Sequence, residues 1–233
     1  MFSKSNPSQI FADGRKLLDN GNHDEAIKAF TKVIDLAPTS YEAYTNRGLA
    51  YVNKFFSIVD SIKEEQRKGV AQKYFSEGVK NFDKAIEILK LVIKKHEGEK
   101  ELLAKVFIFR AEANYFLENL NEVFSDLSHA LQYDSSNPDI YLKRGTLYLD
   151  DLDDPELAIE DFSKGIRIQP SAKAYISRCW AYIENGDAEE AVKDYKRAKT
   201  LDVTFVKNSE RNRSIFKSRQ WEQFKKEADN LSF

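Results

Sequence analysis

The pattern Tyr-x-x-Arg-small-x-x-Tyr occurs three times in this chain, within AYTNRGLAY (43–51), IYLKRGTLY (140–148) and AYISRCWAY (174–182). The first tyrosines of these copies stand at positions 44, 141 and 175. Position 107, the start of FIFRAEANY (107–115), precedes position 141 by the same number of residues as separates 141 from 175. Position 10, the start of IFADGRKLL (10–18), precedes position 44 by that number as well. The interval is therefore constant except between positions 44 and 107. A regular interval of this kind predicts a repeat architecture, in which neighbouring units stack to share a core.

Each unit also has a second half with its own pattern. It is seen in GNHDEAIKAFTKVIDLAP (21–38), DDPELAIEDFSKGIRIQP (153–170) and NGDAEEAVKDYKRAKTLD (185–202). Each segment has an alanine, an aromatic residue four positions later, and a small or short apolar residue three positions after that. Only five prolines and nine glycines interrupt the chain. Apolar residues recur between them at i, i+3, i+4 and i+7, which indicates amphipathic helices and an all-α fold.

These motifs and their interval resemble those of the tetratricopeptide repeat family, whose unit of about 34 residues is a pair of antiparallel helices. The fourth unit carries the family pattern most fully, with Tyr141, Gly145, Tyr148, Ala158, Phe162 and Pro170. The resemblance implies a right-handed α-solenoid. It divides the chain into five repeats, at about 7–40, 41–103, 104–137, 138–171 and 172–203, followed by a degenerate sixth repeat or C-terminal cap at 204–233.

The repeated pattern has a physical reading. Residues three and four apart share one face of a helix, so the tyrosines and the small residue of each pattern lie together. The small residue lets the partner helix approach closely. The arginines at 110, 144 and 178 are each followed, in the second helix, by an aspartate, at 126, 161 and 194. We expect Arg–Asp pairs between the two helices. As exposed pairs they would contribute only about 0–1 kcal/mol each, and would set register more than stability.

The second repeat is too long, because its interval, from position 44 to position 107, is almost twice that of the other units. We expect a long helical-hairpin insertion, with two helices of roughly 25 residues each that project beyond their neighbours as a finger (residues 52–97). The chain has no glycine or proline between the pattern and Gly69, so the first helix should run on and the second should extend from about 70 to 97. An aromatic stripe that includes Phe55 and Phe56 should face Val70, Tyr74 and Phe75. This stripe either closes the finger on itself or offers a site for a partner or a second copy.

The tail after residue 204 has the spacing of a degraded repeat, with a first helix expected at about 205–217. Its second helix would place Trp221, Phe224, Ala228 and Leu231 on one face. A solenoid end needs a cap with a polar outer face. Basic residues that are nearly unopposed suit either that face or an acidic partner; they are Lys207, Arg211, Arg213, Lys217 and Arg219. The acidic run at 150–161 fits a turn and a helix start better than a calcium site.

The sequence predicts no catalytic, cofactor or metal site. The histidines, His23, His96 and His129, are far apart, and neither a glycine-rich phosphate loop nor a His-Glu-x-x-His motif occurs. The single cysteine, Cys179, stands at the small-residue position of the fifth repeat and should pack there. We therefore predict a protein that is not an enzyme and has no cofactor.

The charge balance and the apolar runs also limit the choice of partners and compartment. A net charge of −2 gives no general attraction to nucleic acid or to an anionic membrane. No run approaches the roughly 20 apolar residues of a membrane span, and the first residues lack the apolar stretch of a signal peptide. A single cysteine fits a reducing compartment. We expect a cytoplasmic protein with no nucleic-acid partner and no membrane insertion.

The resemblance implies a groove, lined by the first helix of each repeat, that holds an extended peptide. By analogy, the groove residues are Phe11, Arg15, Asn46, Leu49, Arg110, Lys143, Thr146, Ser177 and Trp180. Asn46 matches an asparagine that bonds ligand backbone in relatives, although a local hydrogen bond explains an asparagine there equally well.

Three functions stay open. The first is an adaptor that binds a peptide or protein segment in the groove. The second is a co-chaperone that binds the C-terminal tail of a chaperone. The carboxylate clamp of such proteins is matched only in part, with Phe11 and Arg15 in the first repeat, Asn46 in the second, and Lys105 or Arg110 in conflicting registers in the third. The third is a structural subunit that contacts its partners through the finger.

Overall fold

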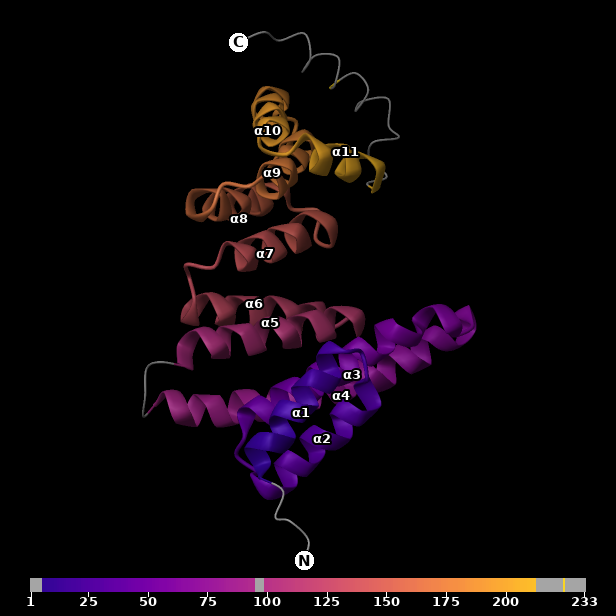
Figure 1. Cartoon of the computed structure of the whole chain (residues 1–233). Coiled ribbons are helices and arrows are strands. Elements are labelled where there is room, and N and C mark those ends of the chain that lie inside the picture. Colours follow the sequence, from indigo (N-terminus) through magenta and orange to yellow (C-terminus); the bar gives the residue numbers. More distant parts are fainter. Residues whose placement is uncertain (1–5, 95–98, 213–223, 225–233) are drawn as a thin grey trace, which may run out of the picture. The chain divides into compact units, whose positions relative to one another are not determined.

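The computed structural model describes residues 6–94, 99–212 and Phe224, and all regular structure in these ranges is helical. The chain forms two compact units, residues 1–134 and 135–233. The first contains α1 to α6 and the second contains α7 to α11 (Figure 1). The all-α solenoid class expected from the repeats is therefore confirmed, whereas the repeat boundaries themselves stay a prediction.

The first unit is built from three consecutive helix pairs. Its helices are α1 (Pro7–Asp19), α2 (His23–Leu36), α3 (Tyr41–Ile58), α4 (Glu64–Ile93), α5 (Lys100–Phe116) and α6 (Leu120–Tyr133), with a short 3-10 turn at Val59–Ser61. Each helix packs against the next along the chain. The second unit has two such pairs and one further helix. These are α7 (Pro138–Asp150), α8 (Pro155–Ile168), α9 (Ala172–Asn185), α10 (Ala188–Leu201) and α11 (Val203–Asn212).

Short polar residues define where many of these helices begin. Ser40 and Ser171 accept hydrogen bonds from backbone N–H groups at the starts of α3 and α9. Asp154 does the same for α8, where a proline follows at the first helical position. Such caps satisfy N–H groups that have no partner inside the helix. At the end of α9, Gly186 takes a left-handed conformation with a φ of 87°, which glycine adopts without strain.

The expected close approach at the small residue is confirmed. A Cβ atom added at Gly145 would lie 2.7 Å from Cε1 of Phe162, and one added at Gly48 would lie 2.7 Å from the equivalent atom of Phe82. The aromatic ring of the second helix therefore occupies the space that a side chain would need. Cys179 is fully buried in the core of the second unit, as its position in the repeat predicts.

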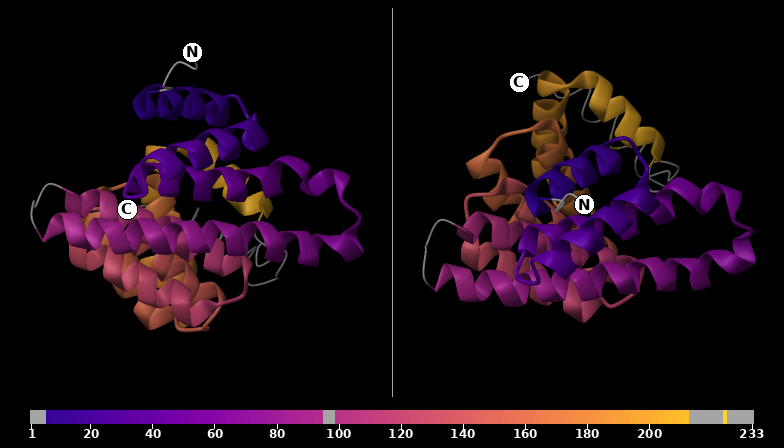
Figure 2. Two further views of the ribbon diagram at one scale, coloured as in Figure 1. Left: turned by 90° about the horizontal axis from the view of Figure 1, so that it is seen from below. Right: turned by 60° about the horizontal axis from the view of Figure 1, so that its bottom comes forward.

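The finger differs from the prediction in where it turns. α3 ends at Ile58 and α4 begins at Glu64, so the two helices have 18 and 30 residues instead of about 25 each. The turn lies at Val59–Lys63, and Gly69 lies inside α4. The hydroxyl of Ser61 donates to the carbonyl of Ile58, and such local bonds compete with the helix. α4 alone is about 45 Å long at 1.5 Å per residue, and its N-terminal part projects together with the end of α3 (Figure 2).

The tail is described only in part. α11 begins at Val203, two residues earlier than expected, and is described to Asn212. Phe224 is buried, with its ring 5.9 Å from that of Tyr195. The other apolar positions predicted for the second tail helix, Trp221, Ala228 and Leu231, lie outside the described residues, as do Arg213, Lys217, Arg219 and the side chain of Arg211. Lys207 is exposed.

Candidate functional site

A cleft of about 410 Å³ opens on the second unit, and we call it the α9 cleft. Its lining comes from three helices, which are labelled in Figure 1: α7 and α9, the first helices of the two pairs in this unit, and α11, the further helix that follows them. The lining residues are Thr146, Asp150, Lys173, Ile176, Ser177, Trp180, Phe205, Asn208 and Ser209. The resemblance to the tetratricopeptide repeat family implies a binding groove lined by first helices, and α7 and α9 hold that position.

The α9 cleft combines an apolar floor with a polar rim. Ile176 and Trp180 are buried in the core of the second unit, and Phe205 packs against the same core. Thr146, Lys173 and Asn208 are exposed around them. Hydroxyl and amide groups can exchange hydrogen bonds with a peptide backbone, while the floor can take an apolar side chain. This combination suits an extended peptide.

Buried ion pairs hold the helices that line the cleft. Arg144 on α7 donates two hydrogen bonds to the carboxylate of Asp161 on α8, with N···O distances of 2.6 and 2.8 Å. Arg178 on α9 binds Asp194 on α10 in the same way, at 2.7 and 2.8 Å. A third pair, Arg110–Asp126, links α5 and α6 in the first unit. All three predicted pairs are therefore confirmed.

The expectation that these pairs are exposed is wrong. The three carboxylates are buried beneath their arginines. The hydrogen bonds and charge of Asp161 raise the pKa of Arg144 above its usual value, so the guanidinium stays charged. Geometry of this kind fixes the angle between paired helices, and so positions the residues that each first helix presents to the cleft.

The structure brings together three of the predicted groove residues in the second unit. Thr146, Ser177 and Trp180 line the α9 cleft. Lys143 lies on α7, half-buried and outside the cleft lining. The remaining five predicted residues belong to the first unit and do not line this cleft; they are Phe11, Arg15, Asn46, Leu49 and Arg110.

Several of these first-unit residues make local contacts. The ring of Phe11 packs 5.7 Å from that of Phe30, and the Asn46 side chain donates to the carbonyl of Glu42 at 2.8 Å. Arg110 binds Asp83 as well as Asp126. Arg15 is exposed, and Leu49 is half-buried. Their assignment to a groove stays a prediction.

Sequence reasoning missed six residues of the α9 cleft. Lys173 stands four positions before Ser177, and Ile176 stands four positions before Trp180, so each shares a helix face with a predicted residue and the repeat register could have indicated it. The others lie where the pattern is weak. Phe205, Asn208 and Ser209 belong to α11, whose repeat pattern is too degraded to set a register, and Asp150 ends α7 within the acidic run that was assigned to a turn.

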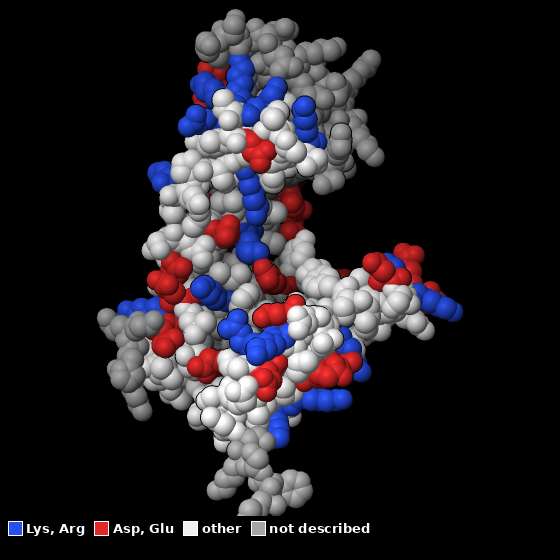
Figure 3. Space-filling model, viewed as in Figure 1, with Lys and Arg blue, Asp and Glu red and all other residues white. Residues whose placement is uncertain are grey.

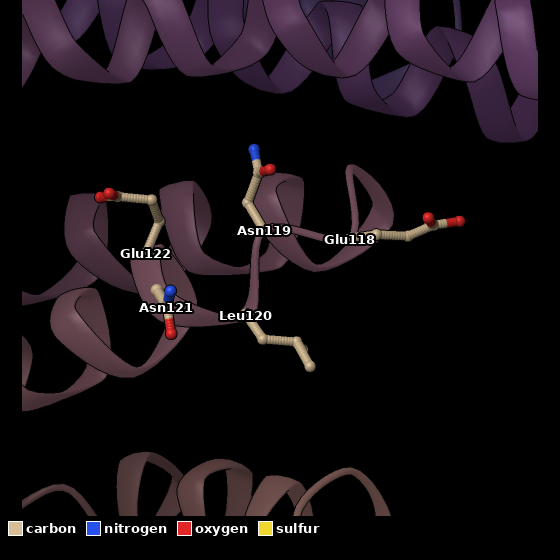
Figure 4. Close-up of a pocket in the computed structure, with 5 residues that line it drawn as sticks. All are labelled: Glu118, Asn119, Leu120, Asn121 and Glu122. Atoms are coloured by element: carbon tan, nitrogen blue, oxygen red, sulfur yellow. The ribbon is translucent and has the colours of Figure 1, made fainter.

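A second hollow, of about 560 Å³, lies at the turn between α5 and α6. Residues 118–122 line it, and Figure 4 shows their side chains pointing in different directions. Without convergent donors or acceptors this hollow has no defined ligand chemistry. Among the residues that the structure describes, no group of three or more His, Cys, Asp or Glu side chains could hold a metal ion. None of the helices within the described ranges has the length and apolar character needed to cross a membrane.

Comparison with known proteins supports the same class. A family model described as "TPR repeat" matches residues 14–54, and one described as "Tetratricopeptide repeat" matches residues 138–171 and 172–202. The chain belongs to the tetratricopeptide repeat family, whose members mediate protein–protein interactions.

Two curated relatives are much longer than the matched region. The chain is 30% identical over 193 residues to tetratricopeptide repeat protein 13 of Homo sapiens, a match that covers 82% of the chain and 19% of that protein. It is 23% identical over 213 residues to the Hsp70-Hsp90 organizing protein of Triticum aestivum, covering 82% of the chain and 34% of that protein. The chain thus spans about a fifth and a third of these relatives.

Solved structures show the same fold. One structure of MamA protein is 24% identical, with a TM-score of 0.58, and the match covers 86% of this chain and 94% of that one. YrrB, described as "a TPR protein with an unusual peptide-binding site", is 15% identical, with a TM-score of 0.61 and coverage of 90% and 94%. These likenesses concern the arrangement of helices.

Proposed function

We propose that this chain is an adaptor that binds an extended segment of another protein in the α9 cleft. The observation that carries the proposal is the meeting of Thr146, Ser177 and Trp180, which were predicted by analogy with the family, in one cleft lined by α7, α9 and α11. Membership of a family of interaction proteins supports it as well.

The chemistry of the cleft limits the ligand. A buried tryptophan beside Ile176 and Phe205 favours an apolar side chain as the anchor. Hydroxyls at 177 and 209 and the amide of Asn208 can satisfy the backbone of an extended segment. The Thr146 hydroxyl donates to the carbonyl of Leu142 and can accept a hydrogen bond from a ligand N–H group. Lys173 and Asp150 carry opposite charges, so the cleft has no single sign to recognise. We therefore expect the apolar anchor to dominate affinity.

The test is a selection of displayed peptides on the folded chain, followed by affinity measurement with the selected sequences. Ser177→Arg fills the cleft from its wall and should weaken binding at least about tenfold, the scale of losing an anchored contact. Arg197→Glu on α10 is the matched control, because Arg197 is exposed on a second helix and does not line the cleft. Peptides that bind both variants equally well would place recognition elsewhere.

A co-chaperone role is the second candidate, and the similarity to the Hsp70-Hsp90 organizing protein of Triticum aestivum is the observation that favours it. The side chains that would form a carboxylate clamp weigh against it, since Arg110 is occupied by two carboxylates and Phe11 packs on Phe30. The discriminating measurement compares one peptide with a free and an amidated C-terminus. A clamp would lose most of its affinity on amidation, whereas binding along the α9 cleft would change little.

A further inference from the structure

Four phenylalanines form one cluster where the finger joins the rest of the first unit. Phe55 and Phe56 of α3 and Phe116 of α5 surround Phe75 of α4, with the Phe75 ring centroid 5.0, 5.8 and 4.7 Å from theirs. The contact of the α3 rings with Phe75 was expected, whereas the part played by Phe116 was missed because it belongs to the next repeat. Phe75 is fully buried, but Phe56 and Phe116 remain 47% and 46% exposed. Half-exposed aromatic rings that pack on a buried ring are typical of an interaction hot spot.

A cleft of about 270 Å³ lies against this cluster, and we call it the phenylalanine cleft. Its apolar lining comes from Phe55, Val59, Ala71, Phe116 and Leu117, and its polar lining from Arg67, Lys68, Gln72 and Glu118. The volume suits an anchoring side chain better than a cofactor. In Figure 3 the charged atoms of the projecting finger gather at its tip, with a largely uncharged surface behind them.

The charges beside the phenylalanine cleft favour an acidic ligand. The lining of the cleft contains two positively charged side chains, Arg67 and Lys68, and one negatively charged side chain, Glu118. The Lys68–Glu118 contact is long, at 3.5 Å, and its side chains are 85% and 79% exposed, so it neutralises little. The complementary ligand is an apolar side chain with carboxylates on both sides, since charge complementarity selects partners and fixes their register.

The chain itself contains such a segment, in the turn between α7 and α8. Leu152 is 51% exposed and stands in the sequence Asp-Asp-Leu-Asp-Asp, residues 150–154. Within the described part of the chain, no other strongly exposed large apolar side chain has an acidic residue on each side. The backbone N–H groups of Asp151 and Leu152 donate to the carbonyl of Leu147, and that of Asp154 donates to Tyr148. The turn is thus already ordered, which lowers the entropic cost of docking it.

We propose that the phenylalanine cleft binds the 150–154 turn of a second copy of this chain. Leu152 of one copy enters the cleft beside Phe116 of the other, and the flanking aspartates face Lys68 and Arg67. The phenylalanine cleft is a different cleft from the α9 cleft, although Asp150 at the start of the turn also lines the α9 cleft. The two surfaces are different, so the contact is heterologous, and a pair keeps one unused turn on one copy and one unused cleft on the other. Association should therefore grow with concentration beyond the dimer.

Sedimentation velocity of the full chain over a range of concentrations tests this proposal. The average mass should rise with concentration above that of one chain. Leu152→Ser and Lys68→Glu should each weaken the association at least about tenfold. Leu201→Ser is the matched control, because Leu201 is a leucine on α10 with a similar exposure of 44%. Circular dichroism verifies that each variant is folded. An equal loss with Leu201→Ser would mean non-specific apolar contact and would overturn the proposal.

A charge exchange makes the test specific to the proposed pair of surfaces. Lys68→Glu and Asp151→Lys should each associate weakly alone. Mixing them should restore association, because the intact turn of the first variant then meets the intact cleft of the second, and the reversed charges face each other in the other contact. A labelled peptide of residues 147–156 should bind the wild-type chain and compete with self-association, and Phe116→Ala should weaken that binding. A chain that stays monomeric and does not bind the peptide would overturn the proposal. So would self-association that Lys68→Glu leaves unchanged, because another surface would then be responsible.

Discussion

Asp161 and Asp194 each receive two hydrogen bonds from an arginine of the preceding helix, in places where the carboxylate is buried. Removing such a carboxylate leaves the guanidinium without its partner in a partly dry site. The regular spacing between arginine and aspartate was enough to predict these pairs from sequence. Their burial was not predictable, because it depends on how the paired helices and their neighbours pack around each carboxylate. The arginine of the second repeat has no aspartate partner. Arg47 donates instead to the side chains of Asn81 and Thr31.

Asp194→Ala should therefore lower the free energy of unfolding by about 3 kcal/mol, the range for breaking a buried ion pair while one charge remains. Denaturant unfolding measures this loss. Replacing both partners, with Arg178→Met and Asp194→Leu, should recover much of the stability, because no unpaired charge is left. A loss below about 1 kcal/mol for Asp194→Ala would show that the pair behaves like an exposed one.

A second prediction concerns His23 at the start of α2. Partial burial lowers the pKa of its imidazole, and the nearby Lys54 acts in the same direction, against Asp24. Among the described residues, Nδ1 of His23 is buried without a hydrogen-bond partner. The unfolded chain therefore binds a proton more readily than the folded one, and stability from this group is present above the unfolded pKa near 6.5 and falls as the pH drops below it.

The expected result is a loss of unfolding free energy between about pH 7.5 and about pH 5.5 that is smaller in His23→Gln than in the wild type. Denaturant unfolding of both proteins at the two pH values measures the difference. The effect should be a fraction of a kcal/mol, because the ring is only half-buried and solvent screens it. Identical pH dependence in the two proteins would exclude His23 as a contributor.

At the scale of helices, some glycines are required by the close packing of two helices and others are not. Gly145 lies against Phe162, so a methyl group there would collide with the ring. Gly69 lies inside α4, and a Cβ atom there would have nothing within 4 Å. The sequence-based reading treated both as informative and was right only for Gly145, where the repeat pattern supplied the partner. For Gly69 it relied on composition alone and misplaced the turn of the finger.

Gly145→Ala should destabilise the chain by about 1–3 kcal/mol through overpacking, despite the better helix propensity of alanine. Gly69→Ala should have the opposite sign and stabilise it by about 0.5–1 kcal/mol, because only the propensity changes. Unfolding midpoints of the two variants, measured side by side, provide the comparison. Two variants that shift stability in the same direction would contradict the close approach at Gly145.

At the scale of the whole molecule, two candidate interaction surfaces occur in different compact units. The α9 cleft belongs to residues 135–233 and the phenylalanine cleft to residues 1–134. The repeat pattern anticipated part of the first surface, because first helices keep their register through the fourth and fifth repeats. The second surface could be predicted only in part from the sequence, because it depends on where the finger turns and on the ring of Phe116 from the next helix pair. A chain with both surfaces could hold a foreign segment while joining copies of itself.

The two surfaces should be separable by mutation. Ser177→Arg should abolish binding of peptides selected for the α9 cleft and leave binding of the 147–156 peptide unchanged, because Ser177 does not line the phenylalanine cleft. Lys68→Glu should do the reverse. Fluorescence anisotropy with both peptides on both variants completes the comparison, and the wild type should bind the two together without competition. If one variant weakens both peptides, or if the peptides displace each other, they share a site and the assignment to two separate clefts is wrong.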